Sequence, residues 1–279
     1  MEIKKTTVGL SVNFYGDLTP SKIIMGLRYL GVEFVEITRS VFSETEEVAK
    51  RLRGIRTAFH LPLVHEDGWD LSCSGFQKEI DETVSLINRH KKNLAIQHAI
   101  AHPPEAKAST LGHESSFDQL MSNLSRLELP VYLENIPTSD PELFLEQYHR
   151  ARSRLGRQMA GICFDAAHYL LSNVNPVQQF NRLRENIGCI HLSDCDQRED
   201  KHLPFGQGGA LPVADLFDAL VKSRFLGYIT LEMKPESPGE IDALLQSYLL
   251  TLRALRKDKF MRTKIRIALL RPFIKRAVT

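Results

Sequence analysis

Histidine and carboxylate residues gather in one short segment toward the end of the chain. The segment "IHLSDCDQREDKHLPFGQG" (190–208) holds His191, Asp194, Asp196, Asp200 and His202. Carboxylates that lie close together repel one another, and a proton or a bound cation has to relieve that repulsion. The segment therefore indicates a metal site, in which His191, Asp200 and His202 are the expected ligands. Asp194 and Asp196 are expected to orient these ligands or to face solvent.

More residues of the same two kinds follow short apolar runs elsewhere in the chain. With those above, the candidate ligands are His60, His102, Glu134, Asp165, His168, His191, Asp200, His202 and Glu232. A single histidine or carboxylate at the end of a strand is more often a structural residue or a helix cap. Five histidines and four carboxylates in one cleft would carry a large electrostatic penalty without cations, and imidazole with carboxylate suits Zn²⁺ or Mn²⁺.

The elements that must position these residues alternate between short apolar runs and longer amphipathic ones. The pattern predicts eight strands, at 8–12, 34–38, 57–61, 100–103, 131–136, 161–165, 189–194 and 228–233. It predicts helices between them, including 20–31, 44–54, 76–90, 115–127, 141–154, 212–223 and 239–255. Repeated strand-helix units of this number predict a single-domain α/β fold, a (β/α)₈ TIM barrel, whose chemistry lies at the carboxyl ends of the strands.

Composition and charge narrow the class of protein. The chain has 279 residues, of which 43% are apolar and 25% charged, as in ordinary globular proteins. Nine of the 36 basic residues but only one of the 34 acidic residues follow Leu255, so residues 1–255 carry a net charge of −6. This acidic body disfavours DNA as a partner, although bound cations would offset part of the charge.

The sequence divides into a predicted barrel, 1–256, and a short basic amphipathic extension, 257–279. The extension could cap the barrel, contact an anionic membrane surface or contact a polyanion. The chain shows no signal peptide or membrane span, and its four cysteines form no CxxC pair. We therefore expect a cytoplasmic protein with reduced cysteines; the sequence predicts no oligomeric state.

Three segments carry a resemblance to a known family. "LENIP" (133–137), "GICFDAAH" (161–168) and "DKHLPFGQG" (200–208) resemble the signature regions of endonuclease IV, a member of the AP endonuclease 2 or xylose isomerase-like barrel superfamily. The order of the segments and their places on the predicted strands agree over residues 1 to about 255.

The resemblance implies a set of roles for the nine candidate ligands. His60, His102 and Glu134 would hold one metal ion, and Glu134 would bridge to a second ion held by Asp165, His191 and Glu232. A third ion would be held by His168, Asp200 and His202. Two or three Zn²⁺ or Mn²⁺ ions would then neutralise phosphate oxygens, activate a water molecule and stabilise the leaving alkoxide during phosphodiester hydrolysis.

The sequence also departs from the DNA-repair pattern. The usual GxHxS opening of the first strand reads "GLSVN", and the loops after the second and third strands lack an obvious set of residues for entering a duplex. Arg39, Trp69 and Asn135 are the available candidates for binding substrate, although a loop tryptophan more often packs on the rim of a barrel. The substrate could therefore be abasic DNA or a smaller phosphodiester.

Two other functions remain open. A sugar or sugar-phosphate isomerase or epimerase of the same superfamily needs one Mn²⁺, Mg²⁺ or Co²⁺ ion, held by Glu134, Asp165, His191 and Glu232. Glu134 and Glu232 would then act as catalytic acid and base, and His168 would bind substrate. His60 and His102 have no evident task in that reaction. The remaining class is a metal-binding barrel without catalysis that binds a partner through its basic extension.

Overall fold

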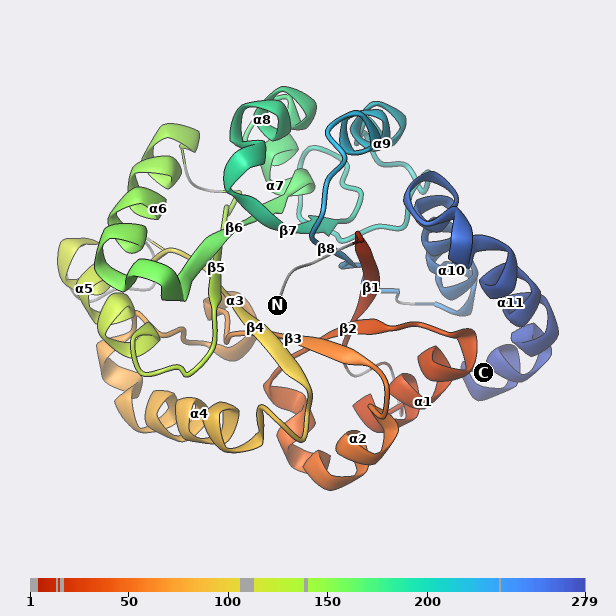
Figure 1. Cartoon of the computed structure of the whole chain (residues 1–279), viewed down its shortest axis with the longest axis horizontal. Coiled ribbons are helices and arrows are strands. Elements are labelled where there is room, and N and C mark those ends of the chain that lie inside the picture. Colours follow the sequence, from red (N-terminus) through yellow and green to blue (C-terminus); the bar gives the residue numbers. More distant parts are fainter. Residues whose placement is uncertain are drawn as a thin grey trace.

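The computed structural model describes residues 5–13, 15, 18–105, 113–137, 140–235 and 237–278, without the side chains of 113, 238, 239 and 272–278. Lys275 and Arg276 of the predicted extension thus lie outside the described side chains. Eight parallel strands close into a barrel, in which each strand pairs with the next and β8 pairs with β1 (Figure 1). They are β1 (Thr7–Val12), β2 (Phe34–Ile37), β3 (Arg56–His60), β4 (Ile96–Ala101), β5 (Val131–Glu134), β6 (Met159–Asp165), β7 (Ile187–Leu192) and β8 (Tyr228–Leu231). The predicted TIM barrel is confirmed.

Helices surround the strands on the outside of the barrel (Figure 1). They are α1 (Pro20–Leu30), α2 (Thr45–Arg51), α3 (Val64–Asp67), α4 (Gln77–His90), α5 (His113–Leu124), α6 (Pro141–Leu155), α7 (Ala166–Leu171), α8 (Pro176–Leu183), α9 (Val213–Lys222), α10 (Pro238–Leu255) and α11 (Lys257–Val278). Prolines begin several of them, where a missing N–H leaves no helical hydrogen bond unmade.

The interior of the barrel is built in layers, and this layering positions the site. An inner cluster contains Phe34, Ala58, Ile100, Tyr132, Cys163, Cys189 and Tyr228. Alternate residues of a strand point to the same side, so the next inward position lies two residues further on. Counting two residues on from the first six of these gives Glu36, His60, His102, Glu134, Asp165 and His191. Inside the barrel, a layer of polar residues, the polar ring, therefore lies next to a layer of apolar and aromatic residues.

Two parts of the predicted element pattern were wrong. Strand β4 begins at Ile96, whereas the sequence pattern placed its start at residue 100. Gln97 and His98 interrupt the apolar run, but the ring of His98 packs inside the barrel, 4.9 Å from that of Tyr132. The second error is that α3, α7 and α8 were not predicted; α7 starts directly after β6, where Asp165 accepts a hydrogen bond from the backbone N–H of His168 and caps the helix.

Close packing in the barrel leaves no room for a side chain at Gly9. A Cβ atom added at Gly9 of β1 would lie 2.2 Å from the backbone oxygen of Phe34 and 2.6 Å from its ring. We expect Gly9→Ala to lower the free energy of unfolding by about 3 kcal/mol, because backbone has to move. Gly75→Ala, with no atom within 4 Å of the added Cβ, is the control. Equal denaturant midpoints for the two variants would contradict this packing.

The basic extension forms a helix of its own. α11 contacts α1 and α10 on the outside of the barrel (Figure 1), where Thr263 and Ile267 are buried. Ion pairs Lys259–Glu33 and Arg271–Asp242 join α11 to the barrel, the second at 2.8 Å between Nη2 and Oδ2. Within the residues described, no helix is both long enough and apolar enough to cross a membrane.

Candidate metal centre

Glu134 is the member of the polar ring that contacts several of the histidines, and its two carboxylate oxygens face different imidazoles. His60 Nε2 lies 3.2 Å and His102 Nε2 3.3 Å from Glu134 Oε2. His191 Nδ1 lies 2.9 Å from the other oxygen, Oε1. The carboxylate is completely buried. Burial alone would raise the pKa of Glu134, but the facing imidazoles of His191 and His102 hold that pKa well below its usual range. Glu134 therefore presents one oxygen to His60 and His102 and the other to His191.

Two groups of candidate ligands meet at this carboxylate. One is His60, His102 and Glu134, and the other is Glu134, Asp165, His191 and Glu232. Within each group, one ligand atom from every residue lies within 4.8 Å of the others. His191 Nδ1 is also 2.8 Å from Glu232 Oε2. The predicted first and second sets are thus brought together by the structure.

The predicted third set is more open. His168 Nε2 lies 2.9 Å from Asp200 Oδ2, and His202 Nε2 lies 3.4 Å from the same oxygen. These three residues do not form a group within 4.8 Å among the described residues, unlike the first two sets. The backbone oxygen of Asn135 lies 2.6 Å from His168 Nδ1, so that N–H can donate to it and leave Nε2 turned toward Asp200.

Buried polar atoms without partners show that a cation would fit here. Asp165 Oδ2, Asp200 Oδ1 and both ring nitrogens of His102 are buried and make no hydrogen bond to the described residues. Such atoms are rare in folded proteins unless an ion or water satisfies them. Burial raises the pKa of Asp165 to about 7, and the negative charge of Glu134 adds to the effect. A bound cation would satisfy these atoms and favour the ionised form of Asp165.

The loop after β7 is held in shape by Asp194. Its Oδ1 accepts hydrogen bonds from the backbone N–H groups of Cys195 and Leu211, at 3.0 and 2.8 Å. The nearby His202 has φ of 48°, a strained backbone conformation for a residue other than glycine. Gly206 and Gly208 have φ of 75° and 88° with open space around them, which favours their role as turn formers.

Asp196 lies on the outer part of the same loop. It accepts hydrogen bonds from the backbone N–H groups of Arg198 and Glu199 and from Lys201 Nζ. Both Asp194 and Asp196 therefore organise the loop that carries Asp200 and His202. This arrangement fits the orienting role expected for them.

Glu36 of β2 is a member of the ring that the sequence analysis missed. Its Oε2 lies 3.0 Å from His191 Nε2 and accepts a hydrogen bond of 3.0 Å from Thr230 Oγ1. Glu36, His60 and His191 also form a group whose ligand atoms lie within 4.8 Å of one another. The available signal was a lone acid inside the apolar run "FVEIT". Such an acid is either a defect in the core or part of a buried polar site.

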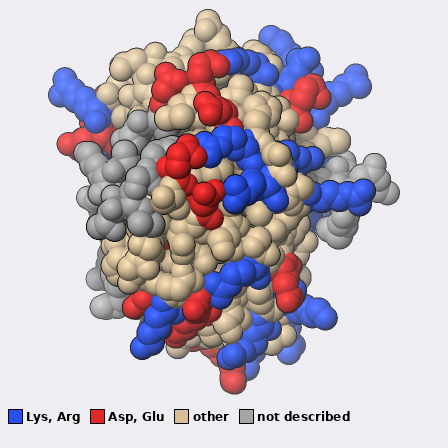
Figure 2. Space-filling model, turned by 90° about the vertical axis from the view of Figure 1, so that its left-hand side faces the viewer, with Lys and Arg blue, Asp and Glu red and all other residues tan. Residues whose placement is uncertain are grey.

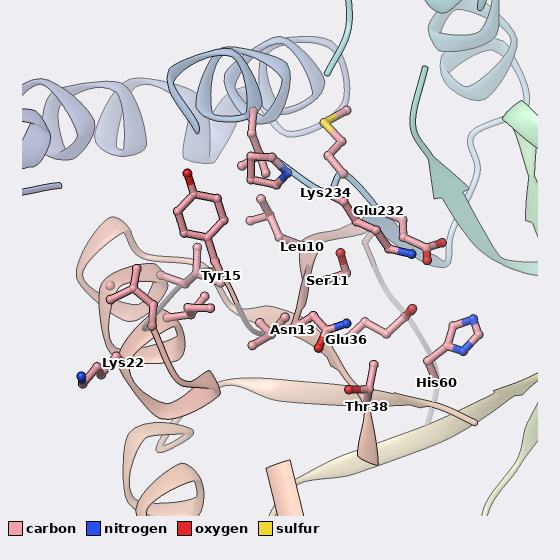
Figure 3. A pocket seen from close by; sticks show the side chains of 18 of the residues that line it. Leu10, Ser11, Asn13, Tyr15, Lys22, Glu36, Thr38, His60, Glu232 and Lys234 are labelled. Carbon is pink, nitrogen blue, oxygen red and sulfur yellow. The ribbon is translucent and has the colours of Figure 1, made fainter. Parts of the chain in front are cut away.

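Two cavities adjoin the centre. One, of about 600 Å³, is lined by polar residues that include His102, His168, Asp200 and His202. The other, of about 830 Å³, reaches Glu36, His60 and Glu232 at one end (Figure 3). Lys234 lines both cavities, and its ammonium group pairs with Glu66. A lysine whose charge is paired with a glutamate therefore borders both cavities.

Comparison with known proteins identifies the family. A family model described as xylose isomerase-like TIM barrel matches residues 27–255. The chain belongs to the xylose isomerase-like TIM barrel family. This confirms the resemblance seen in the sequence at the level of the superfamily. No curated protein matches the chain.

Solved structures of similar fold have different activities. A D-tagatose 3-epimerase-like protein is 18% identical, with a TM-score of 0.62 over 88% of this chain and 98% of that one. An AP endonuclease of family 2 from Brucella melitensis is 15% identical, with a TM-score of 0.63 over 85% and 95%. A D-allulose 3-epimerase from Methylomonas sp. is 15% identical, with a TM-score of 0.63 over 96% and 97%. Identities this low show a shared fold and leave the reaction open.

The three candidate substrate residues of this xylose isomerase-like barrel lie in different places. The ring of Trp69 is 4% exposed and stacks on Phe76, with Arg39 above it, which favours packing on the rim. Arg39 lines the larger cavity. Both amide atoms of Asn135 bond the backbone of Asp165, at 2.9 Å, so Asn135 positions a candidate ligand.

The outer face over α4 to α6 of this xylose isomerase-like barrel has no uniform charge. Figure 2 shows basic and acidic side chains interleaved there. Many are paired, as in Arg126–Asp81 at 2.7 Å and Arg154–Asp118 at 3.0 Å. Paired charges of both signs do not make the positive stripe on which DNA binding depends.

Proposed function

We propose that the protein is a divalent-metal-dependent phosphodiester hydrolase with a dinuclear or trinuclear centre. The observation that carries the proposal is the placement of Glu134. One oxygen faces His60 and His102 and the other faces His191, as a carboxylate that bridges two cations requires. A reaction that needs a single ion gives no reason to bury two further imidazoles against this carboxylate.

Each set of candidate ligands would hold a different ion. His60, His102 and Glu134 would hold one ion, and Glu134, Asp165, His191 and Glu232 the second. His168, Asp200 and His202 are the proposed ligands of a third, with Zn²⁺ or Mn²⁺ as the expected metal. When bound, such ions neutralise negative charge on phosphate oxygens and lower the pKa of water. Lys234, whose ammonium group pairs with Glu66, lines both cavities beside these ligands.

A sugar isomerase or epimerase with one ion is the second candidate. Glu134, Asp165, His191 and Glu232 converge tightly enough to hold a single Mn²⁺, Mg²⁺ or Co²⁺ without the other histidines. Glu134 and Glu232 both lie within 3 Å of His191 Nδ1, so the two carboxylates flank one space. In that reaction they would move a proton between carbons next to a carbonyl group.

A direct assay separates the two candidates. The protein, loaded with Zn²⁺ or Mn²⁺, is incubated with bis(4-nitrophenyl) phosphate, with an oligonucleotide that carries an abasic site, and with a panel of ketoses. We expect release of 4-nitrophenolate and no change in the ketoses. Interconversion of a ketose without phosphodiester cleavage would refute the hydrolase and support the second candidate.

Asp194 holds the loop that carries Asp200 and His202 in shape, and replacing Asp194 tests whether this role matters for metal binding. We expect Asp194→Ala to weaken metal binding at Asp200 and His202 by about 10- to 100-fold, because the residues that orient ligands contribute that much to affinity. Competition with a zinc chelator measures the change. Asp118→Ala is the control, because Asp118 is an exposed aspartate of α5 that pairs with Arg154 at the surface. Equal metal affinity of both variants would contradict the assigned role of Asp194.

A further inference from the structure

The larger cavity is far more apolar than the chemistry of the metal centre requires. Away from the centre its wall is formed by α11 and the two helices that α11 packs against: Ile23 and Leu27 of α1, Ile241, Leu244 and Leu245 of α10, and Leu270 of α11. Ligand cavities of about 300–1,000 Å³ are usual for small molecules. With about 830 Å³, this cavity is large enough for a substrate part in addition to the group that reacts.

Polarity changes sharply along the cavity. Glu36, His60, Glu232 and Lys234 gather at one end, and Tyr15 and Lys22 lie toward the other (Figure 3). The first three are buried, whereas Lys22, Gly26 and Tyr29 of α1 are exposed. The cavity thus leads from the buried polar ring, past apolar side chains, to the outer surface of α1. A ligand that fills it must be polar at one end and apolar over most of its length.

We propose that the substrate is an amphiphile, with a polar head at the metal centre and a hydrocarbon chain in the cavity between α1, α10 and α11. For a phosphodiester head group this rests on the function proposed above. A sugar without an apolar substituent would leave the walls formed by Ile23, Leu244 and Leu270 in contact with water. A hydrocarbon chain would cover them and gain affinity with every buried methylene.

Chain length is the variable that tests the proposal. Binding of methyl, hexyl and dodecyl phosphate to the metal-loaded protein is measured by calorimetry, below the concentrations at which the ligands form micelles. We expect affinity to rise about threefold per added methylene until the cavity is full. Turnover of the matching 4-nitrophenyl alkyl phosphate diesters is followed by release of 4-nitrophenolate.

Two substitutions narrow the cavity from opposite walls. A Cβ atom at Gly26 of α1 would meet no atom within 4 Å, and leucine is a better helix former than glycine, so Gly26→Leu extends into the open space. Leu244→Trp enlarges a half-buried side chain of α10. Either change is expected to lower the ratio of dodecyl to methyl phosphate affinity at least tenfold. Gly75→Leu is the matched control, because Gly75 does not line the cavity, and it should keep the ratio.

The outcomes separate this proposal from the proposed function. Chain-length dependence that Gly26→Leu removes supports the amphiphile. If that dependence is present but no diester is cleaved, the hydrocarbon site stands and the phosphodiesterase is refuted. If the diesters are cleaved but affinity does not depend on chain length, the phosphodiesterase stands and the amphiphile is refuted.

The outer face of α11 carries a second, independent proposal. Met261, Ile265 and Leu269 lie four residues apart and are 57%, 55% and 69% exposed, so they form one apolar stripe on the solvent side. At 100° per residue, Arg262 and Arg266 border the stripe on one side and Lys264 on the other. Apolar residues flanked by cations are the pattern of a helix that lies in the surface of an anionic membrane.

We infer that α11 docks this face onto an anionic phospholipid bilayer. The test is sedimentation of the full chain with vesicles of phosphatidylcholine alone or with 30% phosphatidylglycerol. We expect binding only to the anionic vesicles, reduced at least tenfold by Ile265→Glu with Leu269→Glu. The control is Leu226→Glu, because Leu226 is equally exposed but lies outside α11. No binding, or binding that a single-stranded oligonucleotide abolishes while Ile265→Glu with Leu269→Glu does not reduce it, would refute the inference.

Discussion

Glu134→Gln is expected to lower turnover by about 1,000-fold or more, because the carboxylate at the middle of the centre cannot be replaced by an amide. The amide keeps the size of the side chain but loses its charge. One of its two positions becomes an N–H₂ group that faces the imidazoles of His60 and His102 or that of His191. The same loss is expected under the isomerase alternative, in which Glu134 moves a proton. The measurement is the steady-state rate with the metal content of each sample determined alongside.

Glu128→Gln is the control for this substitution, since Glu128 is an exposed glutamate paired with Lys91 at the surface. It should leave both turnover and metal content unchanged. A Glu134→Gln protein that is folded and retains more than a tenth of the activity would contradict both proposed functions.

His60→Ala is expected to reduce phosphodiester hydrolysis by about 100-fold and to remove about one metal ion per chain. The imidazole lies against Oε2 of Glu134 and is not a member of the four-residue group around His191, so its loss should leave that group intact. A single-ion isomerase would therefore change only a few-fold. The substitution thus affects the two candidate reactions very differently, whereas Glu134→Gln does not.

His149→Ala provides the control, because His149 is exposed on α6, on the outside of the barrel. It should behave as the unaltered protein does in both assays. If His60→Ala keeps the full metal content and the full hydrolytic rate, a dinuclear mechanism cannot hold.

The sequence predicted the barrel, and the structure brings the first two predicted sets of ligands together in it. Short apolar runs ending in His or Asp/Glu imply strands whose carboxyl ends meet, and the structure places Glu134 within 3.3 Å of His60, His102 and His191. The start of β4 was missed because His98 is polar yet packs against Tyr132 and Tyr228. Hydrophobic periodicity cannot show that an imidazole will join an aromatic cluster.

Other features depend on contacts that a single sequence does not reveal. In the sequence, Glu36 is an isolated acid in an apolar run, because its partners His191 and Thr230 lie far along the chain. The apolar cavity arises where α1, α10 and α11 meet, and these helices come from opposite ends of the chain. The sequence showed that α11 mixes basic and apolar residues, but which of them face the barrel depends on that packing.

The measurement that tests the central claim most directly is the number of metal ions per chain. Elemental analysis of the purified protein, and of His60→Ala prepared in the same way, determines it. A bridging Glu134 predicts about two to three Zn²⁺ or Mn²⁺ ions per chain, with about one fewer in the variant. A single ion that is retained in full by His60→Ala would contradict the bridged centre and leave the isomerase as the better account.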